Sequence, residues 1–215
     1  MMIKHYLKVA FRNLAKYKVQ SIVSILGLAV GFVCFALSTL WIRYEMTYDT
    51  FHEGAERIYL VRAHYAHEPG KISNSTPYPL ADYLQKGNPE IEAMASTSVQ
   101  KVKFRVKDTE KDVVSAAADS VLMNFFNIRV LRGTVNFLKG TNGEIAITEE
   151  FSKRIFGEEE ALGREVEVSG HASKVGAIVS GWSSHSNIPY SILTSARHYT
   201  QWGSANENLF VRIRK

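Results

Sequence analysis

Cysteine is nearly absent from this sequence. Cys34 is the single cysteine among 215 residues. An intramolecular disulfide is therefore impossible, and so is a metal site built from cysteine ligands. A lone thiol gives no indication of the redox compartment.

Sequence motifs of nucleotide and metal chemistry are also missing. The sequence has no GxxxxGK[ST] motif, which excludes a P-loop ATPase within this chain, and no HExxH or strand-linked GxGxxG motif. The seven histidines are scattered. His64 and His67 could approach each other on a turn, but no carboxylate partner is evident, so we predict no metal site and no cofactor.

One segment weakly resembles a hydrolase motif. Residues 181–186 read GWSSHS, which lacks the G-x-S-x-G spacing of a nucleophile elbow. We interpret Ser183, Ser184 and His185 as part of a polar loop and predict that the chain is not an enzyme. A membrane-tethered hydrolase using these three residues is the third of our hypotheses.

Acidic residues are absent from the first eighteen positions, which carry five basic residues: Lys4, Lys8, Arg12, Lys16 and Lys18. The whole chain has 26 basic and 21 acidic residues, so residues 19–215 hold 21 of each and are neutral. The sequence pI of about 9.2 is thus a property of the N-terminal segment. No basic face is spread over a domain, and we predict no nucleic-acid binding.

Residues 19–42 contain no charged side chain, and thirteen of these 24 residues are Leu, Ile, Val or Phe. As a helix the run is about 36 Å long, enough to cross a hydrocarbon core of about 30 Å. A signal peptide has a shorter apolar region and a small-residue cleavage site, whereas this run ends in Trp41-Ile42-Arg43. We predict an uncleaved transmembrane helix over residues 19–43.

The charges on either side predict its orientation. Five Lys and Arg residues precede the span, while Arg43 follows it with Glu45, Asp49 and Glu53 close behind. The positive-inside rule then places the N-terminus in the cytoplasm and residues 44–215 across the membrane.

Small residues recur along the span at three- and four-residue steps: Ser24, Gly27, Gly31, Cys34 and Ser38. Gly27 and Gly31 form a GxxxG pair, which allows close approach of a second helix in lipid. We predict a helix-packing face here. The alternative is that glycine is simply common in membrane helices.

Before the span, residues 1–18 alternate apolar and basic positions at helical spacing. Such a helix lies in the membrane interface with its cations toward anionic headgroups. We therefore predict a basic interfacial helix. The alternative is a basic flank that only sets topology.

Residues 44–215 predict an α+β fold in which an extracytoplasmic α/β domain of two small subdomains follows the transmembrane helix. A hairpin is expected where Asp108–Lys111 joins two strand candidates. The predicted strands are 57–64, 91–98, 102–107, 113–118, 128–132, 144–148, 165–168, 174–179 and 209–214. The predicted helices are 78–86, 120–126 and 149–156.

Several motifs in this order resemble one transporter family. They are the basic start IKHYLKVAFRNLAKYK, the span ILGLAVG, then YDTFH and RIYLV, followed by NPEIEAMAS, FFNIRVLRG and EIAITEEFSKRIFG. This order resembles the N-terminal part of MacB-like and FtsX-like ABC transporter permeases. The motif residues nearest the span are Tyr48, Asp49, Phe51, His52, Arg57, Ile58 and Tyr59.

The resemblance implies a periplasmic core domain, with a porter-like and a second α/β subdomain, anchored in the cell inner membrane. It implies an ABC ATPase on a separate chain and other permease helices or a second permease copy as partners, besides the lipid bilayer. It also implies that ATP-driven motion reaches the periplasmic domain for efflux or lipoprotein release.

The sequence departs from this family in one respect. Family permeases have further membrane helices after the periplasmic domain, and no long apolar run follows residue 42 here. We expect either a fragment of a longer permease or a truncated relative. A membrane-tethered extracytoplasmic sensor or binding module without a transport role is the alternative function.

Overall fold

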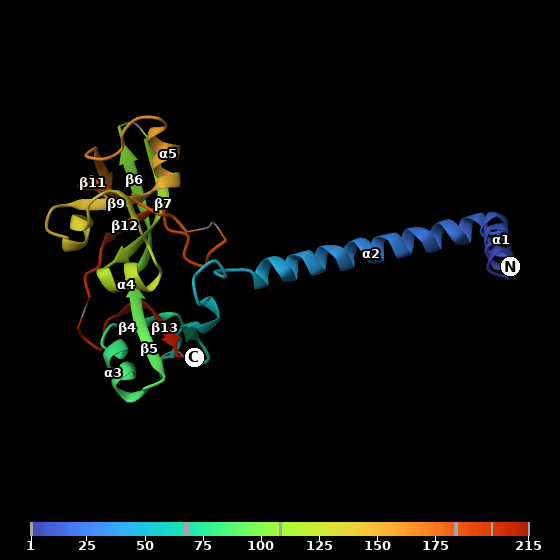
Figure 1. The fold of residues 1–215 in the computed structure, drawn as a ribbon, viewed down its shortest axis with the longest axis horizontal. Helices are drawn as coiled ribbons and strands as arrows, with labels where there is room; N and C mark the ends of the chain where they lie inside the picture. Colours follow the sequence, from blue (N-terminus) through green and yellow to red (C-terminus); the bar gives the residue numbers. More distant parts are fainter. Residues whose placement is uncertain (1, 67–68, 108, 183–184, 199, 215) are drawn as a thin grey trace. The chain divides into compact units, whose positions relative to one another are not determined.

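The structure is a computed structural model that describes residues 2–66, 69–107, 109–182, 185–198 and 200–214. The chain separates into two compact units, residues 1–48 and residues 49–215 (Figure 1). We describe each unit by itself.

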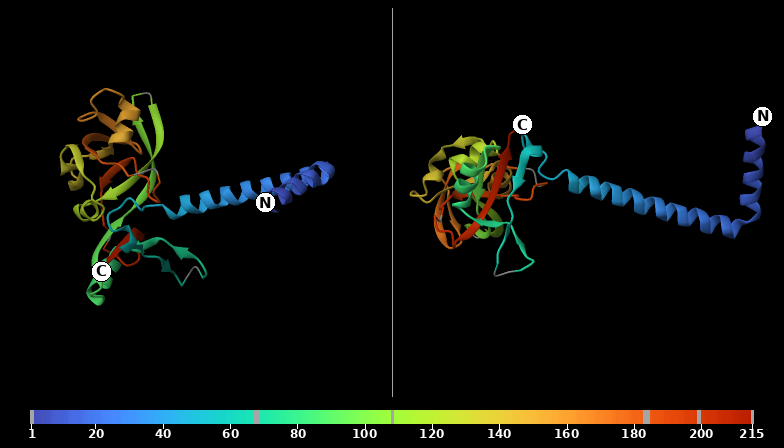
Figure 2. Two further views of the ribbon diagram at one scale, coloured as in Figure 1. Left: turned by 45° about the vertical axis from the view of Figure 1, so that its right-hand side comes forward. Right: turned by 90° about the horizontal axis from the view of Figure 1, so that it is seen from below.

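The N-terminal unit consists of α1 (Met2–Lys16) and α2 (Lys18–Met46), which meet at a bend (Figure 2). Among the described residues, α2 is the one helix long and apolar enough to cross a membrane, judged by length and composition. No residue of α2 is buried. Large apolar side chains are exposed along α2, among them Leu28, Phe32 and Phe35.

The C-terminal unit has a smaller, fully antiparallel sheet. Strand β13 pairs with β5 along one side and with β1 and β4 along the other. The strands are β1 (Ile58–Leu60), β4 (Ser75–Pro77), β5 (Ile91–Thr97) and β13 (Ala205–Ile213). Strands β2 (Ala63–His64) and β3 (Ile72–Ser73) follow β1 and precede β4 in the sequence, and they pair with each other as a short antiparallel sheet.

The larger sheet closes on itself. Its order is β10-β6-β7-β12-β9-β11-β8, and β10 also pairs with β11, so the first six strands form a ring. The strands are β6 (Val99–Val106), β7 (Thr109–Ala118), β8 (Val130–Gly133), β9 (Glu144–Thr148), β10 (Glu165–Val168), β11 (His171–Val179) and β12 (Ile192–Ser195).

Three α-helices cover these sheets: α3 (Leu80–Gly87), α4 (Ser120–Phe125) and α5 (Glu149–Phe156). Figure 1 shows α3 beside the smaller sheet, α5 at the far end of the larger one and α4 in between. Two short 3₁₀ helices are η1 (Ala55–Arg57) and η2 (Val135–Lys139). Local capping sets the ends of α5, since the Thr148 hydroxyl accepts from the Phe151 amide and Gly157 follows with φ 60°.

The two faces of the ring bury different cores. The outer face packs against α4 and η2 around Leu122, Phe126 and Phe137. The inner face holds Phe104, Ile147 and Ile192 against Phe151 of α5. A third, small core around Leu209 lies under α3 on the smaller sheet.

The mixed α/β fold predicted from the sequence is confirmed, and the bounds of β9, β10 and α5 are as predicted. The expected strand over residues 57–64 is interrupted, because Arg57 belongs to η1 and the chain leaves β1 after Leu60. The hairpin of β6 and β7 is tighter than expected. Its pairing continues to Val106 opposite Thr109, with Lys107 at φ 50° turning the chain.

Candidate functional site

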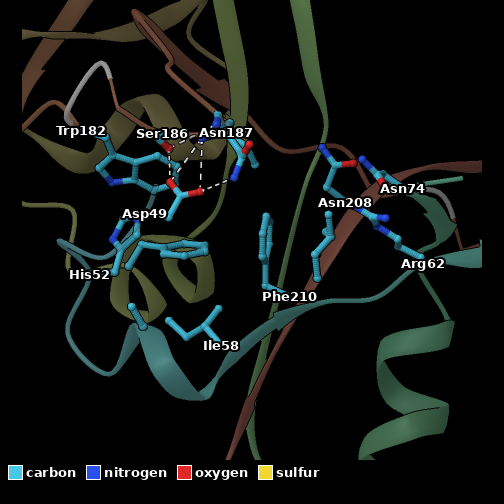
Figure 3. A pocket seen from close by; sticks show the side chains of 14 residues that line it. Asp49, His52, Ile58, Arg62, Asn74, Trp182, Ser186, Asn187, Asn208 and Phe210 are labelled. Atoms are coloured by element: carbon cyan, nitrogen blue, oxygen red, sulfur yellow. Dashed lines mark hydrogen bonds between the residues drawn. The ribbon is translucent and has the colours of Figure 1, made fainter. Parts of the chain in front are cut away.

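The C-terminal unit begins at Asp49, whose side chain is held by a distant loop. The Asp49 carboxylate accepts hydrogen bonds from the Ser186 hydroxyl (2.5 Å) and from the side-chain and backbone amides of Asn187 (2.7 and 3.2 Å). The Asp49 backbone amide donates to the His185 carbonyl (3.2 Å). We call Asp49, His185, Ser186 and Asn187 the Asp49 clamp; Figure 3 shows the side chains of Asp49, Ser186 and Asn187.

Local backbone chemistry prepares both sides of the clamp. Asp49 has φ 55°, a left-handed conformation that Asp and Asn tolerate better than most residues. On the loop, the buried Ser186 hydroxyl also accepts from the Ile188 amide at 3.2 Å, which fixes its position. Hydrogen bonds to an ionised carboxylate are about twice as strong as neutral ones. The clamp is therefore a strong link between residues far apart in the sequence.

His52 follows the clamp and packs on an aromatic wall. Its ring centroid lies 4.9 Å from that of Phe126 and 4.8 Å from that of Trp182. Phe126 in turn contacts Trp182 (4.9 Å) and Phe210 (5.1 Å). Burial lowers the pKa of His52, while the nearby Asp49 charge acts in the opposite direction. The neutral imidazole thus serves as an additional flat ring in this wall.

Arg57 connects the same segment to the smaller sheet. Its guanidinium lies 2.6 Å from the Glu92 carboxylate and donates to the Ile213 carbonyl at 3.1 Å. Glu92 is also 4.0 Å from Arg212, whose guanidinium lies over the Phe125 ring and donates to the Phe125 carbonyl. Residues 49–57 are therefore fixed both to the 185–188 loop and to strands β5 and β13.

A cavity of about 390 Å³ lies against the clamp and the aromatic wall. In Figure 3 the Asp49 carboxylate and Asn187 stand at one end, Arg62, Asn74 and Asn208 at the other, and Ile58 and Phe210 between them. The remaining lining residues are His52, Ala55, Leu60, Phe126, Trp182, Ser186 and Ile188.

A second polar cluster joins residues of both sheets. The His198 imidazole contacts the Asp119 carboxylate at 3.0 Å, and its other nitrogen lies 3.8 Å from Glu207 of β13. The Tyr78 ring stacks on His198 with 3.9 Å between centroids. Asp119 also caps α4 by accepting from the Leu122 amide at 2.7 Å. We call His198, Asp119, Glu207 and Tyr78 the His198 cluster.

This environment raises the pKa of His198 to about 9, chiefly through the contacts with Asp119 and Glu207. Burial opposes ionisation of Asp119, but the hydrogen bonds from His198 and the Leu122 amide outweigh it and lower the pKa of Asp119. At neutral pH an imidazolium therefore lies between two carboxylates.

The structure brings some sequence-predicted site residues together and leaves others apart. Asp49, His52, Arg57 and Ile58 gather around the cavity and its supports, while Phe51 and Tyr59 are exposed. Tyr48 is the last residue of the N-terminal unit. The predicted packing residues Ser24, Gly27, Gly31, Cys34 and Ser38 all lie in α2. Of the predicted surface cations, Lys4, Lys8, Arg12 and Lys16 lie in α1, and Lys18 is the first residue of α2.

Of the three residues of the hydrolase hypothesis, the structure describes His185. Ser183, Ser184 and His67 lie outside the described residues. His185 contributes its carbonyl oxygen to the clamp, and His64 is exposed in β2. Among the described residues, no group of three or more His, Cys, Asp or Glu side chains is placed to hold a metal ion.

Sequence reasoning missed the partners of these residues. Ser186 and Asn187 stand 137 and 138 positions from Asp49, and the rings of Phe126 and Phe210 meet only after folding. Alternation and capping patterns report local structure, so they carry no signal for such pairs.

Comparison with known proteins assigns the chain to a family. Residues 21–215 match the MacB-like periplasmic core domain. No curated protein sequence matches the chain. The fold is similar to a domain described as part of a permease from Porphyromonas gingivalis, with TM-score 0.62 and 18% identity over 76% of this chain and 77% of that one.

Two further solved structures share the fold. The extracellular domain of the noncanonic ABC-type transporter YknZ from Gram-positive bacteria has TM-score 0.53 and 15% identity, covering 74% of this chain and 82% of that one. The periplasmic region of MacB from Actinobacillus actinomycetemcomitans has TM-score 0.51 and 11% identity, covering 73% of each chain. With the family match over residues 21–215, this chain belongs to the family of MacB-like periplasmic core domains.

Proposed function

We propose that this chain is a membrane-anchored permease component of an ABC-type efflux or lipoprotein-release system, and that it transmits ATP-driven motion to an extracytoplasmic domain. The family match supports a transporter component. In this proposal α2 crosses the inner membrane with the N-terminus in the cytoplasm and residues 49–215 in the periplasm, as the flanking charges favour. A separate ATPase supplies the energy, and the chain itself catalyses no reaction.

The arrangement of α1 follows from the same proposal. Its exposed cations, Lys8, Arg12 and Lys16, recur every four residues, and Phe11 and Leu14 are exposed as well. A helix of this kind lies in the membrane interface, where anionic headgroups attract the cations. α1 would then hold the cytoplasmic end of α2 at a fixed depth.

The observation that carries the proposal is the Asp49 clamp. Tyr48 and Asp49 are joined by a peptide bond, so any displacement of α2 enters the C-terminal unit at Asp49. There the clamp transfers the displacement to the 185–188 loop, and the ion pair of Arg57 with Glu92 transfers the same displacement to the smaller sheet. Interfaces and packed cores move as rigid bodies rather than deforming continuously. A pull on the chain would therefore move the domain instead of only unravelling its first residues.

Replacing Asp49 with alanine tests this coupling. The variant loses hydrogen bonds to a charged group, each worth about 1.5–3 kcal/mol, so the 185–188 loop becomes independent of residue 49. In the membrane-embedded complex with its ATPase, we expect hydrogen exchange at residues 185–188 to differ between nucleotide-free and ATP–vanadate states for the native chain. We expect this difference to vanish in Asp49→Ala while ATP hydrolysis continues.

Two matched variants complete this test. Asp49→Asn keeps a side chain suited to φ 55° and one acceptor oxygen, so it should retain part of the response. Asp112→Ala removes an exposed carboxylate of β7 and should retain all of it. An equal nucleotide response in Asp49→Ala and the native chain would refute transmission through the clamp.

The small face of α2 supplies a second prediction. Gly27 and Gly31 have no neighbouring atom within 4 Å of an added Cβ, so a side chain can begin at both positions without a clash. Gly27→Leu with Gly31→Leu should nevertheless weaken association with partner membrane helices, because bulky side chains prevent close approach of the backbones. We expect co-purification of partner subunits in mild detergent to fall at least several-fold, with residues 49–215 still folded.

The control for this double variant lies on the opposite side of α2. Ala29→Leu with Val33→Leu also places leucine at two positions, about 200° around the helix, and should leave co-purification intact. If both double variants co-purify with partners as the native chain does, the GxxxG pair has no packing role.

One observation favours the alternative, an extracytoplasmic binding module. The cavity of about 390 Å³ has polar groups at each end and apolar residues between them, and its volume is within the range of ligand sites. A binding module needs no ATPase. Failure of any ATPase to associate with the full chain in native membranes would favour this function over the transport proposal.

A further inference from the structure

The strand ring of the larger sheet has an inner face that is only partly filled. Cross-strand pairing places Val102 opposite Val113 and Gln100 opposite Ser115, so these alternate residues share the inner face. Toward α5 the interior is packed with Phe104, Ile147 and Phe151, which are almost completely buried. That end of the ring is therefore closed by a hydrophobic plug.

The other end of the ring is open. A cavity of about 540 Å³ lies there, and all six strands of the ring contribute to its lining. Its floor is apolar at Val102 and Val168, and above the floor it presents Gln100, Ser115 and Thr194. Within the described part of the chain, no hydrogen bond occupies the side-chain hydroxyls of Ser115 or Thr194. Ligand cavities are frequently found in the mouths of β-barrels and have volumes of about 300–1,000 Å³.

A buried carboxylate stands at this mouth. Glu207 lines the cavity, and its side chain is only 6% exposed. Within the described residues its nearest cation is His198 Nδ1 at 3.8 Å, beyond hydrogen-bond distance. His198 already contacts Asp119 at 3.0 Å through its other nitrogen. One imidazolium thus faces both carboxylates, and the exposed Arg197 also lines the cavity.

A second carboxylate of the lining is also unsatisfied. Glu144 lies at the start of β9, and its buried Oε2 atom has no hydrogen-bond partner within the described residues. A buried carboxylate oxygen without a donor is costly, because it has lost its hydration. A cation with N–H donors in the cavity would compensate for Glu207, whereas alternation along β9 directs the Glu144 side chain to the face opposite Ile145 and Ile147. A bare metal ion fits poorly, since no group of three candidate ligands is found among the described residues.

We propose that the mouth of the strand ring binds a small organic ammonium compound carrying hydroxyl or amide groups. The Glu207 carboxylate receives the ammonium group, and Gln100, Ser115 and Thr194 bond the polar body. The apolar floor at Val102 and Val168 supports its carbon skeleton. This site is separate from the Asp49 clamp, and none of its residues belongs to the cavity shown in Figure 3.

D-Glucosamine and D-glucose are a matched pair of probes, since they differ only at C2, which carries an ammonium group in glucosamine and a hydroxyl group in glucose. We expect the full chain in detergent, studied by titration calorimetry at neutral pH, to bind glucosamine at least tenfold more tightly than glucose. Glu207→Gln should weaken glucosamine binding at least tenfold and leave glucose unchanged. Glu167→Gln, a substitution in the same ring on its outer face, should bind as the native chain does.

A further variant separates binding from folding. Because Glu207→Gln also alters the His198 cluster, Thr194→Val serves as a cavity variant that keeps every charge. It should weaken glucosamine binding without lowering the melting temperature by more than a few degrees. Equal affinity for the two sugars, undetectable binding of glucosamine to the native chain, or full binding by Glu207→Gln would each overturn the proposal.

Discussion

Phe126→Ala is expected to lower the free energy of unfolding of the C-terminal unit by about 3–5 kcal/mol, the usual cost of removing a buried phenylalanine ring. The Phe126 side chain is 8% exposed, and its ring meets the rings of His52, Trp182 and Phe210. Alanine would leave a void bounded by three rings held by separate segments. These segments cannot all move inward to fill it.

Denaturant unfolding of the full chain in detergent measures this loss, with tryptophan fluorescence as the signal because Trp182 lies against Phe126. Phe51→Ala is the matched control, since Phe51 is 44% exposed and should cost less than about 1 kcal/mol. Equal losses for the two variants would show that the aromatic wall does not hold the unit together.

The second large effect is a loss of stability in mild alkali. The pKa of His198 in the folded chain is about 9, above the ordinary histidine value of 6.5. A group whose folded pKa is raised stabilises fully below its unfolded pKa, and this contribution disappears as the pH rises through the folded pKa. From pH 6.5 to about 9 the free energy of unfolding should therefore fall, by about 3 kcal/mol at most.

The His198→Gln variant tests this assignment. It should be less stable than the native chain at pH 6.5 and should lose the downward slope between pH 6.5 and 9. The lowered pKa of Asp119 has the opposite sign, because its contribution is present above the ordinary Asp pKa and disappears in acid. A native chain whose melting temperature stays constant from pH 6.5 to 9.5 would contradict the charged His198 cluster.

The sequence could predict those elements whose signals are local. Helix α5 begins after a capping threonine and ends before a glycine, so both ends are encoded within a few residues. The apolar run of α2 is similarly explicit, because its length and lack of charge need no tertiary context.

The closure of the strand ring could not be predicted from the sequence. It depends on β10 pairing with β6, some sixty positions earlier in the chain, as well as with its neighbour β11. Strand β12 was missed for a related reason. It has four residues, its first two are buried on opposite faces, and it therefore shows no polar alternation.

The Asp49 clamp has one part that the sequence could indicate and one part that it could not. The motif around Asp49 and His52 was identified through its resemblance to a family, but the hydrogen-bond partners of Asp49 are Ser186 and Asn187. Polar residues in a loop carry no periodic signal that would select them as partners of a carboxylate 137 positions away. Only the folded geometry reveals that the segment after α2 is tied to that loop.

Accessibility of single cysteines in intact cells tests the central proposal, that α2 crosses the membrane and places the domain outside. In a Cys34→Ala background, Ser169→Cys introduces a thiol in the turn between β10 and β11, and Lys8→Cys introduces one in α1. A membrane-impermeant maleimide that enters the periplasm should label Ser169→Cys in whole cells, and Lys8→Cys only after lysis. Labelling of Lys8→Cys in whole cells, with Ser169→Cys protected until lysis, would contradict the proposed orientation.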